Sequence, residues 1–243
     1  MSYFKNTAYV PYKFGTSNTY TLHQDISVYV DIVDQVRNNG AFYQKYTILD
    51  GDRPDNLSQK LYKSPKYYWT FFLMNDKLRE RGWPMSNQKI LELVKSERNN
   101  TTLTTRDDLT GIFNVGSTVT GQSSGATGTI IKRRLDLGQI IIEGDKSFQS
   151  TEIIRTTEDG DLHTATLVGA VHQYDSVHHY EDADGNWVDV NPYTAPGSSY
   201  SAISYYDRYV LENESLKDIV VLKPDVVSAV FTQFQESMRT EVN

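Results

Sequence analysis

The spacing of apolar residues changes several times along this chain, and each change marks a predicted element. From Asp25 to Asn38 the apolar positions keep near-helical spacing and Asn38-Asn39-Gly40 supplies a stop, which predicts one amphipathic helix. Phe42 to Leu49 then carries Tyr and Ile at β-favouring positions and predicts a strand. Asp50-Gly51-Asp52 is the expected turn at its end.

Two short helices are predicted after this turn. Pro54 suits the first helical position because its missing N–H needs no partner there, and Leu57 and Leu61 fall on one face. Ser64-Pro65 repeats the same start signal, with Ser64 as the cap, and predicts a second helix over Tyr67–Met74. The order is therefore strand, helix, helix.

A further helix is expected after a connector that ends at Gly82-Trp83-Pro84. Ser86 can cap it, and Ile90, Leu91 and Val94 give it an apolar face. Beyond Asn99 the pattern changes to short β-type runs separated by Gly, Ser and Asp, which predicts a small all-β barrel or sandwich. The expected strands are Val115–Thr120, Gly128–Ile131, Gln139–Glu143 and Glu152–Thr156.

The carboxyl-terminal part returns to mixed elements. His178–Tyr180 and Trp187–Val190 flank a turn at Asp182–Asn186 and predict a β-hairpin, and Pro192–Ser204 is expected to be a loop. A helix over Asp207–Leu216 and an apolar strand over Ile219–Leu222 follow. The final helix opens at Pro224, and its apolar stripe comprises Val227, Val230, Phe231, Phe234 and Met238.

Composition divides the chain into two populations of residues. Aromatic residues make up 12% of the 243 residues, yet they are sparse between Trp83 and Tyr174, where glycines gather. We interpret the chain as an α+β protein with an inserted β module. The expected segments are an extended N-terminal arm (1–22), a helix plus a small two-helix module (23–100), the inserted β module (103–170), and a C-terminal hairpin, strand and helix (171–243).

The N-terminal arm is rich in tyrosine and phenylalanine and has no helical period. Such a segment is either frayed or laid over a neighbouring molecule. Disordered tails are normally poor in aromatic residues, so we favour the neighbour.

Charge and cysteine content exclude several classes of function. With 31 acidic against 24 basic residues the net charge is -7, which disfavours nucleic acid and anionic membrane as partners. Cysteine is absent, so disulfides and thiolate chemistry are excluded. Neither an export signal nor a run long enough to cross a membrane is apparent, so we expect no membrane partner.

The polar motifs do not assemble into a recognisable active site. Asp182–Asn186 resembles part of a calcium loop, but its glycine comes too early, so a hairpin turn is the better interpretation. His178 and His179, as neighbours on a strand, should point to opposite faces and are expected to be ordinary polar surface. Lys132-Arg133-Arg134 is expected to be a solvated strand end, and Gly121–Gly128 a turn. We expect no enzyme activity, no catalytic residues, no cofactor and no metal.

Aromatic residues are the remaining candidates for function. A domain this small cannot bury every ring of a short helix, so some should meet a partner protein. The candidate partner-binding residues are Tyr9, Tyr12, Phe14, Tyr68, Phe72, Trp83, Phe231 and Phe234.

Two stretches of the chain resemble a known family. The run DRPDNLSQKLYKSPKYYWTFFLMND followed by GWPMS, and YVLENESLKDIVVLKPDVVSAVFTQFQESM from Tyr209 to Met238, are similar to the LysM-containing baseplate wedge proteins (the subunit-fifty-three type) of T-even-like contractile-tailed phages. The likeness covers residues 20 to 100 and 171 to 240, whereas residues 103 to 170 have no counterpart in the shorter family members.

The resemblance implies a LysM-like βααβ module and a virion structural protein. Its place would be the tail baseplate of a myovirus, assembled in the host cytoplasm, where it would contact other wedge and hub-proximal proteins and help to join neighbouring wedges. The alternative is a peptidoglycan- or chitin-binding LysM module. In LysM modules the sugar-binding loops correspond here to Gly51–Pro54 and Asn75–Lys77. Asp52-Arg53-Pro54 departs from the usual sequence after the glycine, so glycan binding is not expected.

Overall fold

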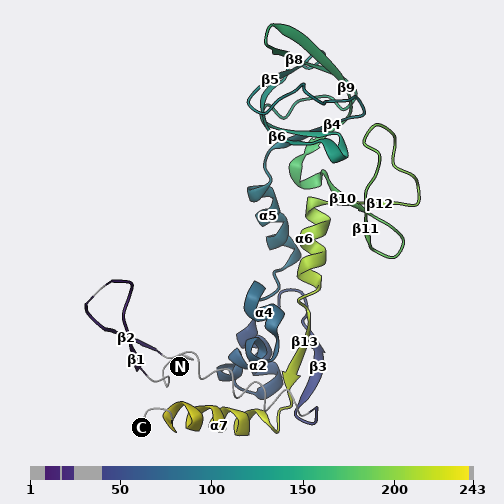
Figure 1. Cartoon of the computed structure of the whole chain (residues 1–243). Coiled ribbons are helices and arrows are strands. Elements are labelled where there is room, and N and C mark those ends of the chain that lie inside the picture. The colour runs from purple at the N-terminus through teal and green to yellow at the C-terminus, as the bar shows by residue number, and fades with distance from the viewer. Residues whose placement is uncertain (1–8, 17, 25–39, 241–243) are drawn as a thin grey trace. The chain divides into compact units, whose positions relative to one another are not determined.

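The computed structural model describes residues 9–16, 18–24 and 40–240 of the chain, and divides it into two compact units. One unit combines the residues up to Ser86 with those from Asn213 onward, and the other is the continuous segment Asn87–Glu212. The helix expected at Asp25–Asn38 lies outside the described residues. Both units contain helices as well as strands (Figure 1). The α+β class is therefore confirmed.

The first unit contains the two short helices predicted after Asp52. Pro54 occupies the first turn of α2 (Pro54–Tyr62), and Lys63 caps the end of this helix in a left-handed conformation with φ 58°. The Ser64 side chain accepts a hydrogen bond from the Lys66 amide at the start of the next turn, as the cap signal predicted. The elements are β3 (Tyr43–Thr47), α2 (Pro54–Tyr62), the 3-10 turn η2 (Pro65–Tyr67), α3 (Trp69–Met74), α4 (Asp76–Arg81), β13 (Asp218–Leu222) and α7 (Val227–Thr240).

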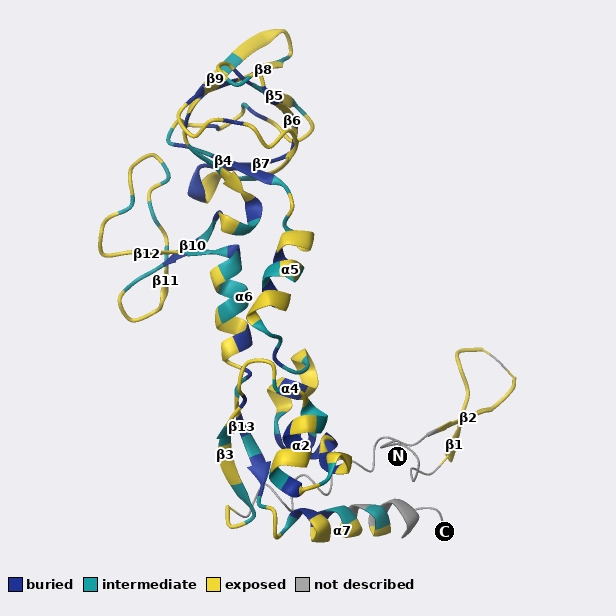
Figure 2. Ribbon diagram, turned by 180° about the vertical axis from the view of Figure 1, so that it is seen from behind, coloured by how far each residue is buried: buried dark blue, intermediate teal, exposed yellow. Residues whose placement is uncertain are grey.

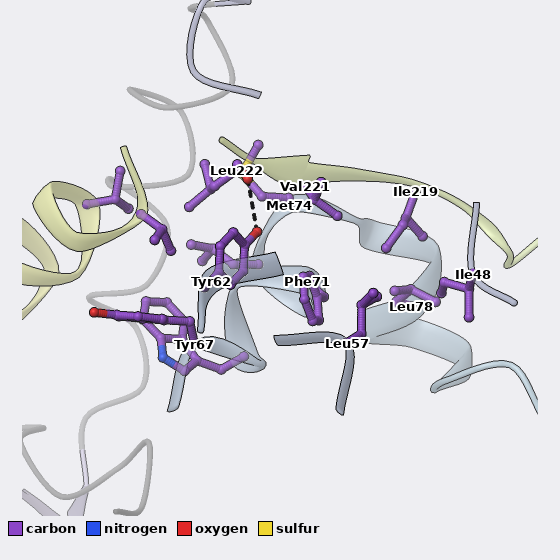
Figure 3. Packing of buried hydrophobic residues seen from close by; sticks show 14 of the residues in the cluster. Ile48, Leu57, Tyr62, Tyr67, Phe71, Met74, Leu78, Ile219, Val221 and Leu222 are labelled. Atoms are coloured by element: carbon purple, nitrogen blue, oxygen red, sulfur yellow. Dashed lines mark hydrogen bonds between the residues drawn. The ribbon is translucent and has the colours of Figure 1, made fainter. Parts of the chain in front are cut away.

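Strand β3 finds its partner at the far end of the chain. It pairs antiparallel with β13, in a register that joins Thr47 to Asp218 and Tyr43 to Leu222. The helices pack on this two-stranded sheet, and Figure 3 shows Leu57 and Phe71 of the helices facing Val221. All three side chains are fully buried. The core of the unit is therefore built from two segments of chain that are far apart in sequence.

Two features of this unit differ from the sequence expectations. The connector after Asn75 contains a further helix, α4, which the pattern missed because Leu78 is its only apolar residue. The last helix begins at Val227 and not at Pro224, and Val227 and Val230 of its stripe are buried in the core.

The second unit contains a closed six-stranded antiparallel barrel. Of the two folds expected for the β module, the barrel is therefore the one observed. Side chains alternate between its interior and solvent along β6 and β8. Leu103, Phe113, Ile130, Ile140, Ile142 and Ile154 fill the interior. The strands, in barrel order, are β4 (Thr101–Thr105), β7 (Gln139–Gly144), β6 (Thr127–Arg134), β5 (Thr118–Gly121), β8 (Ile153–Glu158) and β9 (Asp161–His172).

The glycine-rich segment at Gly121–Gly128 forms a turn between β5 and β6, as predicted, and one buried carboxylate holds it. Glu152 accepts hydrogen bonds from the amides of Ser123, Ser124 and Gln149, at 3.0, 2.9 and 2.7 Å, and from the Ser124 hydroxyl. Burial alone would raise the pKa of Glu152, but these donors together hold it below its usual value. The segment is therefore held as a tight turn of the barrel.

The rest of the second unit flanks the barrel in sequence. The predicted hairpin is present, and its turn is closed because Asp182 accepts hydrogen bonds from the amides of Asp184 and Asn186, both at 2.9 Å. A third strand, β12, lies within the expected loop at Pro192–Ser204. The elements are α5 (Asn87–Glu97), the 3-10 turns η3 (Leu135–Leu137) and η4 (Gln173–Asp175), β10 (Val177–Glu181), β11 (Trp187–Val188), β12 (Ser201–Ser204) and α6 (Tyr205–Glu214).

The compact units are cut at different positions from the four segments expected from sequence. The first unit is discontinuous because its second strand, β13, follows the whole of the other unit in the chain. The described part of the arm expected at 1–22 is also not one extended segment. It folds back as a hairpin of β1 (Tyr9–Tyr12) and β2 (Thr21–Gln24), with Gly15 in the turn at φ 52°.

Candidate interaction surfaces

The N-terminal hairpin carries the most exposed of the candidate aromatic residues. Every residue of 9–16 and 18–23 is exposed, and the exposed fractions of Tyr9, Tyr12 and Phe14 lie between 55% and 63%. Figure 2 shows this hairpin almost entirely in the colour of exposed residues. An isolated two-stranded hairpin is marginally stable in water at best.

Rings gather on one side of this hairpin. Tyr12 and Phe14 meet edge to face, with centroids 4.8 Å apart, and Phe14 meets His23 at 5.0 Å. Thr21 on the opposite strand donates a hydrogen bond to the Tyr12 carbonyl at 3.3 Å, and its hydroxyl lies 2.8 Å from His23 Nε2. The hairpin therefore presents an organised aromatic cluster without an interior of its own.

The candidates on the helices of the first unit are divided between surface and core. Tyr68 is 36% exposed, whereas Phe72 and Trp83 are half-buried and pack against the core. The Trp83 ring lies 5.8 Å from Phe71 and 5.9 Å from Phe72, and its indole N–H donates to the Asp52 carbonyl at 2.6 Å. Trp83 therefore packs against the core of its own unit and is hydrogen-bonded to the turn that follows β3.

The candidates on α7 also serve the fold in part. Phe231 is half-buried and packs edge to face on Tyr67, at 5.5 Å, and beside Trp69, at 6.2 Å. The Lys66 ammonium lies 5.4 Å from the Phe231 ring. The side chain of Phe234 lies outside the described part of the chain. Of the candidates, Tyr9, Tyr12, Phe14 and Tyr68 are therefore exposed. The other described candidates, Phe72, Trp83 and Phe231, are partly buried against the core of the first unit.

The described cavity beside one of the two loops that the LysM resemblance singled out does not extend to the other loop. A cavity of about 320 Å³ opens beside Asn75–Leu78 and the start of β13, but Gly51–Pro54 does not line it. Asn75 itself is engaged inside the protein. Its amide donates to the carbonyls of Phe71 and Val220, and its oxygen accepts from the Val220 amide, each at 2.8 Å.

The histidine pair, expected to be ordinary surface, is instead an organised polar cluster. A β-bulge between Val177 and His179 interrupts the alternation of β10, so that the Nδ1 atoms of His178 and His179 lie 2.9 Å apart. Burial, and next the positive charges of Arg208 and Arg134, lower the pKa of His178 to about 4. The expectation that the two side chains point to opposite faces was wrong, because the alternation of residues along a strand does not reveal where a β-bulge will interrupt it.

Arg134 is also not the solvated strand end that the basic run predicted. Its guanidinium donates to the His178 carbonyl at 2.8 Å and pairs with Asp136 at 3.0 Å. Arg133 donates to the Leu109 carbonyl and to Asn114. Both arginines therefore tie the end of β6 to other parts of the second unit.

The described residues contain neither a metal-binding cluster nor a membrane-spanning helix. No group of three or more ligating side chains lies close enough to hold a metal ion within this part of the chain. Among the same residues, no helix has the length and apolar character needed to span a bilayer.

Comparison with known proteins does not assign the chain to a family. No protein-family model matches it, and no curated protein shows a significant match.

Proposed function

We propose that this chain is a structural subunit of a contractile phage tail, placed in a baseplate wedge, where it docks onto other wedge proteins. The observation that carries the proposal is the N-terminal hairpin, because it exposes Tyr9, Tyr12 and Phe14 together. Large aromatic side chains are favoured at protein interfaces and bury much area at low entropic cost. A partner that covers the hairpin would supply the interior that it lacks.

The arrangement of the first unit supports a further part of the proposal, that this unit is a LysM-like βααβ module. Its order is strand β3, helices α2 and α3, and strand β13, with the two strands antiparallel. In this interpretation the second strand is supplied only after the segment Asn87–Glu212 has intervened. The resemblance of the flanking sequences to baseplate wedge proteins agrees with this arrangement.

Sugar binding by a LysM module is the less supported alternative. One of the two relevant loops is held under Trp83, and Asn75 of the other is bonded to β13. Calorimetric titration with N-acetylglucosamine oligomers tests it directly, and we expect no heat of binding.

The docking proposal is tested with purified wedge proteins of a contractile tail. We expect the full chain to form a stable complex with at least one of them. The double variant Tyr12→Ser with Phe14→Ser should bind about tenfold more weakly or worse, because buried aromatic anchors dominate interface energies.

The matched control removes apolar surface elsewhere. Leu162 and Val168 are 64% and 50% exposed on the barrel, so Leu162→Ser with Val168→Ser tests a general loss of apolar surface. This control should bind like the unaltered chain. Equal binding by the hairpin variant, or no retention by any wedge protein, contradicts the proposal.

A further inference from the structure

A second candidate surface lies in the other unit, beside the small sheet β11–β10–β12 (Figure 1). A cavity of about 260 Å³ opens there between the end of β6 and the β10–β11 hairpin. Its lining includes Arg134, Asp136, His178, His179, Trp187 and Asp189. The aromatic hairpin at the N-terminus takes no part in it.

Trp187 is the most unusual residue of this cavity. It is 64% exposed, although tryptophan is among the costliest residues to leave in water. One side of its indole stacks on the His179 ring, with centroids 4.0 Å apart and an interplanar angle of 29°. Because one face is covered and the residue remains mostly exposed, the other face is open to a ligand.

The His179 ring beneath Trp187 is held by a chain of hydrogen bonds in which each donor and acceptor can be assigned in only one way. Arg208 can only donate, so His178 Nε2 accepts from it at 2.8 Å. His178 therefore carries its proton on Nδ1 and donates to His179 Nδ1 at 2.9 Å. His179 is left with a proton on Nε2, which it donates to Glu181 at 2.9 Å. The platform under the indole is thus fixed before any ligand arrives.

The charges of the lining favour a cation. With both histidines neutral, the lining carries one cation, Arg134, and two carboxylates, Asp136 and Asp189. Arg134 and Asp136 neutralise each other at 3.0 Å. Asp189 is exposed and forms no hydrogen bond or ion pair with any residue in the described part of the chain. A free carboxylate therefore accompanies an open indole face.

We propose that this cavity binds the guanidinium group of an arginine side chain presented by a partner protein. A guanidinium is planar, so it can stack on the open face of Trp187 and direct its donors to Asp189 at the same time. An ammonium group has no flat face and would satisfy only the charge. An anion is disfavoured because the lining carries more carboxylates than cations and Arg134 is already paired with Asp136.

The test follows the indole N–H resonance of Trp187 in the isotope-labelled full chain while a short capped peptide with one arginine is added. We expect a saturable shift with a dissociation constant on the order of 1 mM, as befits one cation–π contact and one exposed ion pair. The resonances of Trp69 and Trp83 lie in the other unit and should stay in place. A citrulline peptide, which keeps the shape without the charge, should cause no shift.

Two substitutions of equal charge separate a specific site from general attraction. Asp189→Asn should weaken the binding of the arginine peptide about threefold to fivefold. Asp184→Asn alters an exposed carboxylate in the turn of the same hairpin, away from the cavity lining, and should leave the affinity unchanged.

Three outcomes would overturn the proposal. These are an equal loss of affinity in the two variants, an equal shift with citrulline, and a Trp187 resonance that does not move with arginine. A shift caused by inorganic phosphate but not by arginine would identify an anion site instead. Failure here would leave the docking proposal untouched, because the N-terminal hairpin is tested with different variants.

Discussion

At the scale of single residues, His178 has an environment unlike that of an ordinary surface side chain. It lies between a neutral imidazole and the guanidinium groups of Arg208 and Arg134, with the Arg208 contact at 2.8 Å. A proton added to His178 would place another positive charge among these groups and would break the acceptor role of Nε2. The folded protein therefore resists protonation of this ring, while the unfolded chain does not.

This resistance predicts a loss of stability at mildly acidic pH. The folded-state pKa is about 4, below the ordinary 6.5, so the unfolded chain takes up the proton first as the pH falls. The contribution of His178 to stability should be fully present above pH 6.5 and should decrease as the pH falls from there to about 4. We expect a loss of about 1 kcal/mol, because solvent screens a ring that is only partly buried. Chemical denaturation of the second unit at a series of pH values measures it.

The variant His178→Gln provides the control. Glutamine can accept from Arg208 and donate to His179, but it does not titrate. The decrease between pH 6.5 and 4.5 should therefore vanish in this variant. Carboxylates with lowered pKa, such as Glu152 and Glu158, lose their stabilising charge only at lower pH, so they do not mask the result. A variant as sensitive to pH as the unaltered chain would refute the assignment.

Residue patterns predicted burial better than they predicted polar networks. Leu57, Val94 and Val230 are buried as their helical spacing indicated, because the apolar face of a helix is stable only when it is turned toward a core. The contact between His178 and His179 depends on a bulge, and the bulge depends on how β12 pairs with β10. No local property of the two histidines encodes that pairing.

At the scale of elements, Asn75 connects a helix to a strand that comes 145 residues later. It lies where α3 ends, and its side-chain amide hydrogen-bonds both the N–H and the carbonyl of Val220, as the backbone of a neighbouring strand would. Its amide also caps the Phe71 carbonyl at the end of α3. One side chain thus satisfies three backbone groups at once.

The substitution Asn75→Ala should therefore destabilise the first unit. It leaves the Val220 amide and the carbonyls of Val220 and Phe71 without their partner, and unsatisfied groups of this kind cost about 1–3 kcal/mol. We expect a loss of about 2 kcal/mol in the free energy of unfolding, measured by denaturant titration. Asn56→Ala, at an exposed position of α2, should change stability by less than about 0.5 kcal/mol. Similar losses in the two variants would show that Asn75 is not a structural connector.

Strand β4 illustrates which elements the sequence concealed. Four of its five residues are threonine, and none of the strands expected from the sequence included Thr101–Thr105. The structure buries Thr102 and Thr105 completely, and their hydroxyls bond to Ser176 and to the Thr166 carbonyl. Threonine fits a strand by its branched shape, and its polarity becomes acceptable only when hydrogen-bond partners from distant parts of the chain are in place.

At the scale of the whole molecule, the first unit is completed only after the second has been synthesised. Strand β3 pairs with β13 over its full length, and Val221 and Leu222 of β13 are fully buried in the shared core. The Tyr62 hydroxyl also bonds to the Leu222 carbonyl, at 3.0 Å (Figure 3). The chain enters and leaves the intervening segment at neighbouring points, since Asn213 bonds to the amide of Met85 at 2.7 Å and to its carbonyl at 3.0 Å.

This geometry predicts that the second unit can be removed without unfolding the first. Residues 1–86 joined by a short glycine-serine linker to residues 213–243 should melt cooperatively and protect the β13 amides from exchange, because the Met85–Asn213 contact already holds the two ends together. Residues 1–86 alone should show no cooperative transition, because β3 would lack its partner and the core would lose Val221 and Leu222. Far-UV circular dichroism and amide exchange compare the two. If the shorter chain melted like the joined one, β13 would not be part of the folding unit, and the LysM-like interpretation with a split second strand would fall with it.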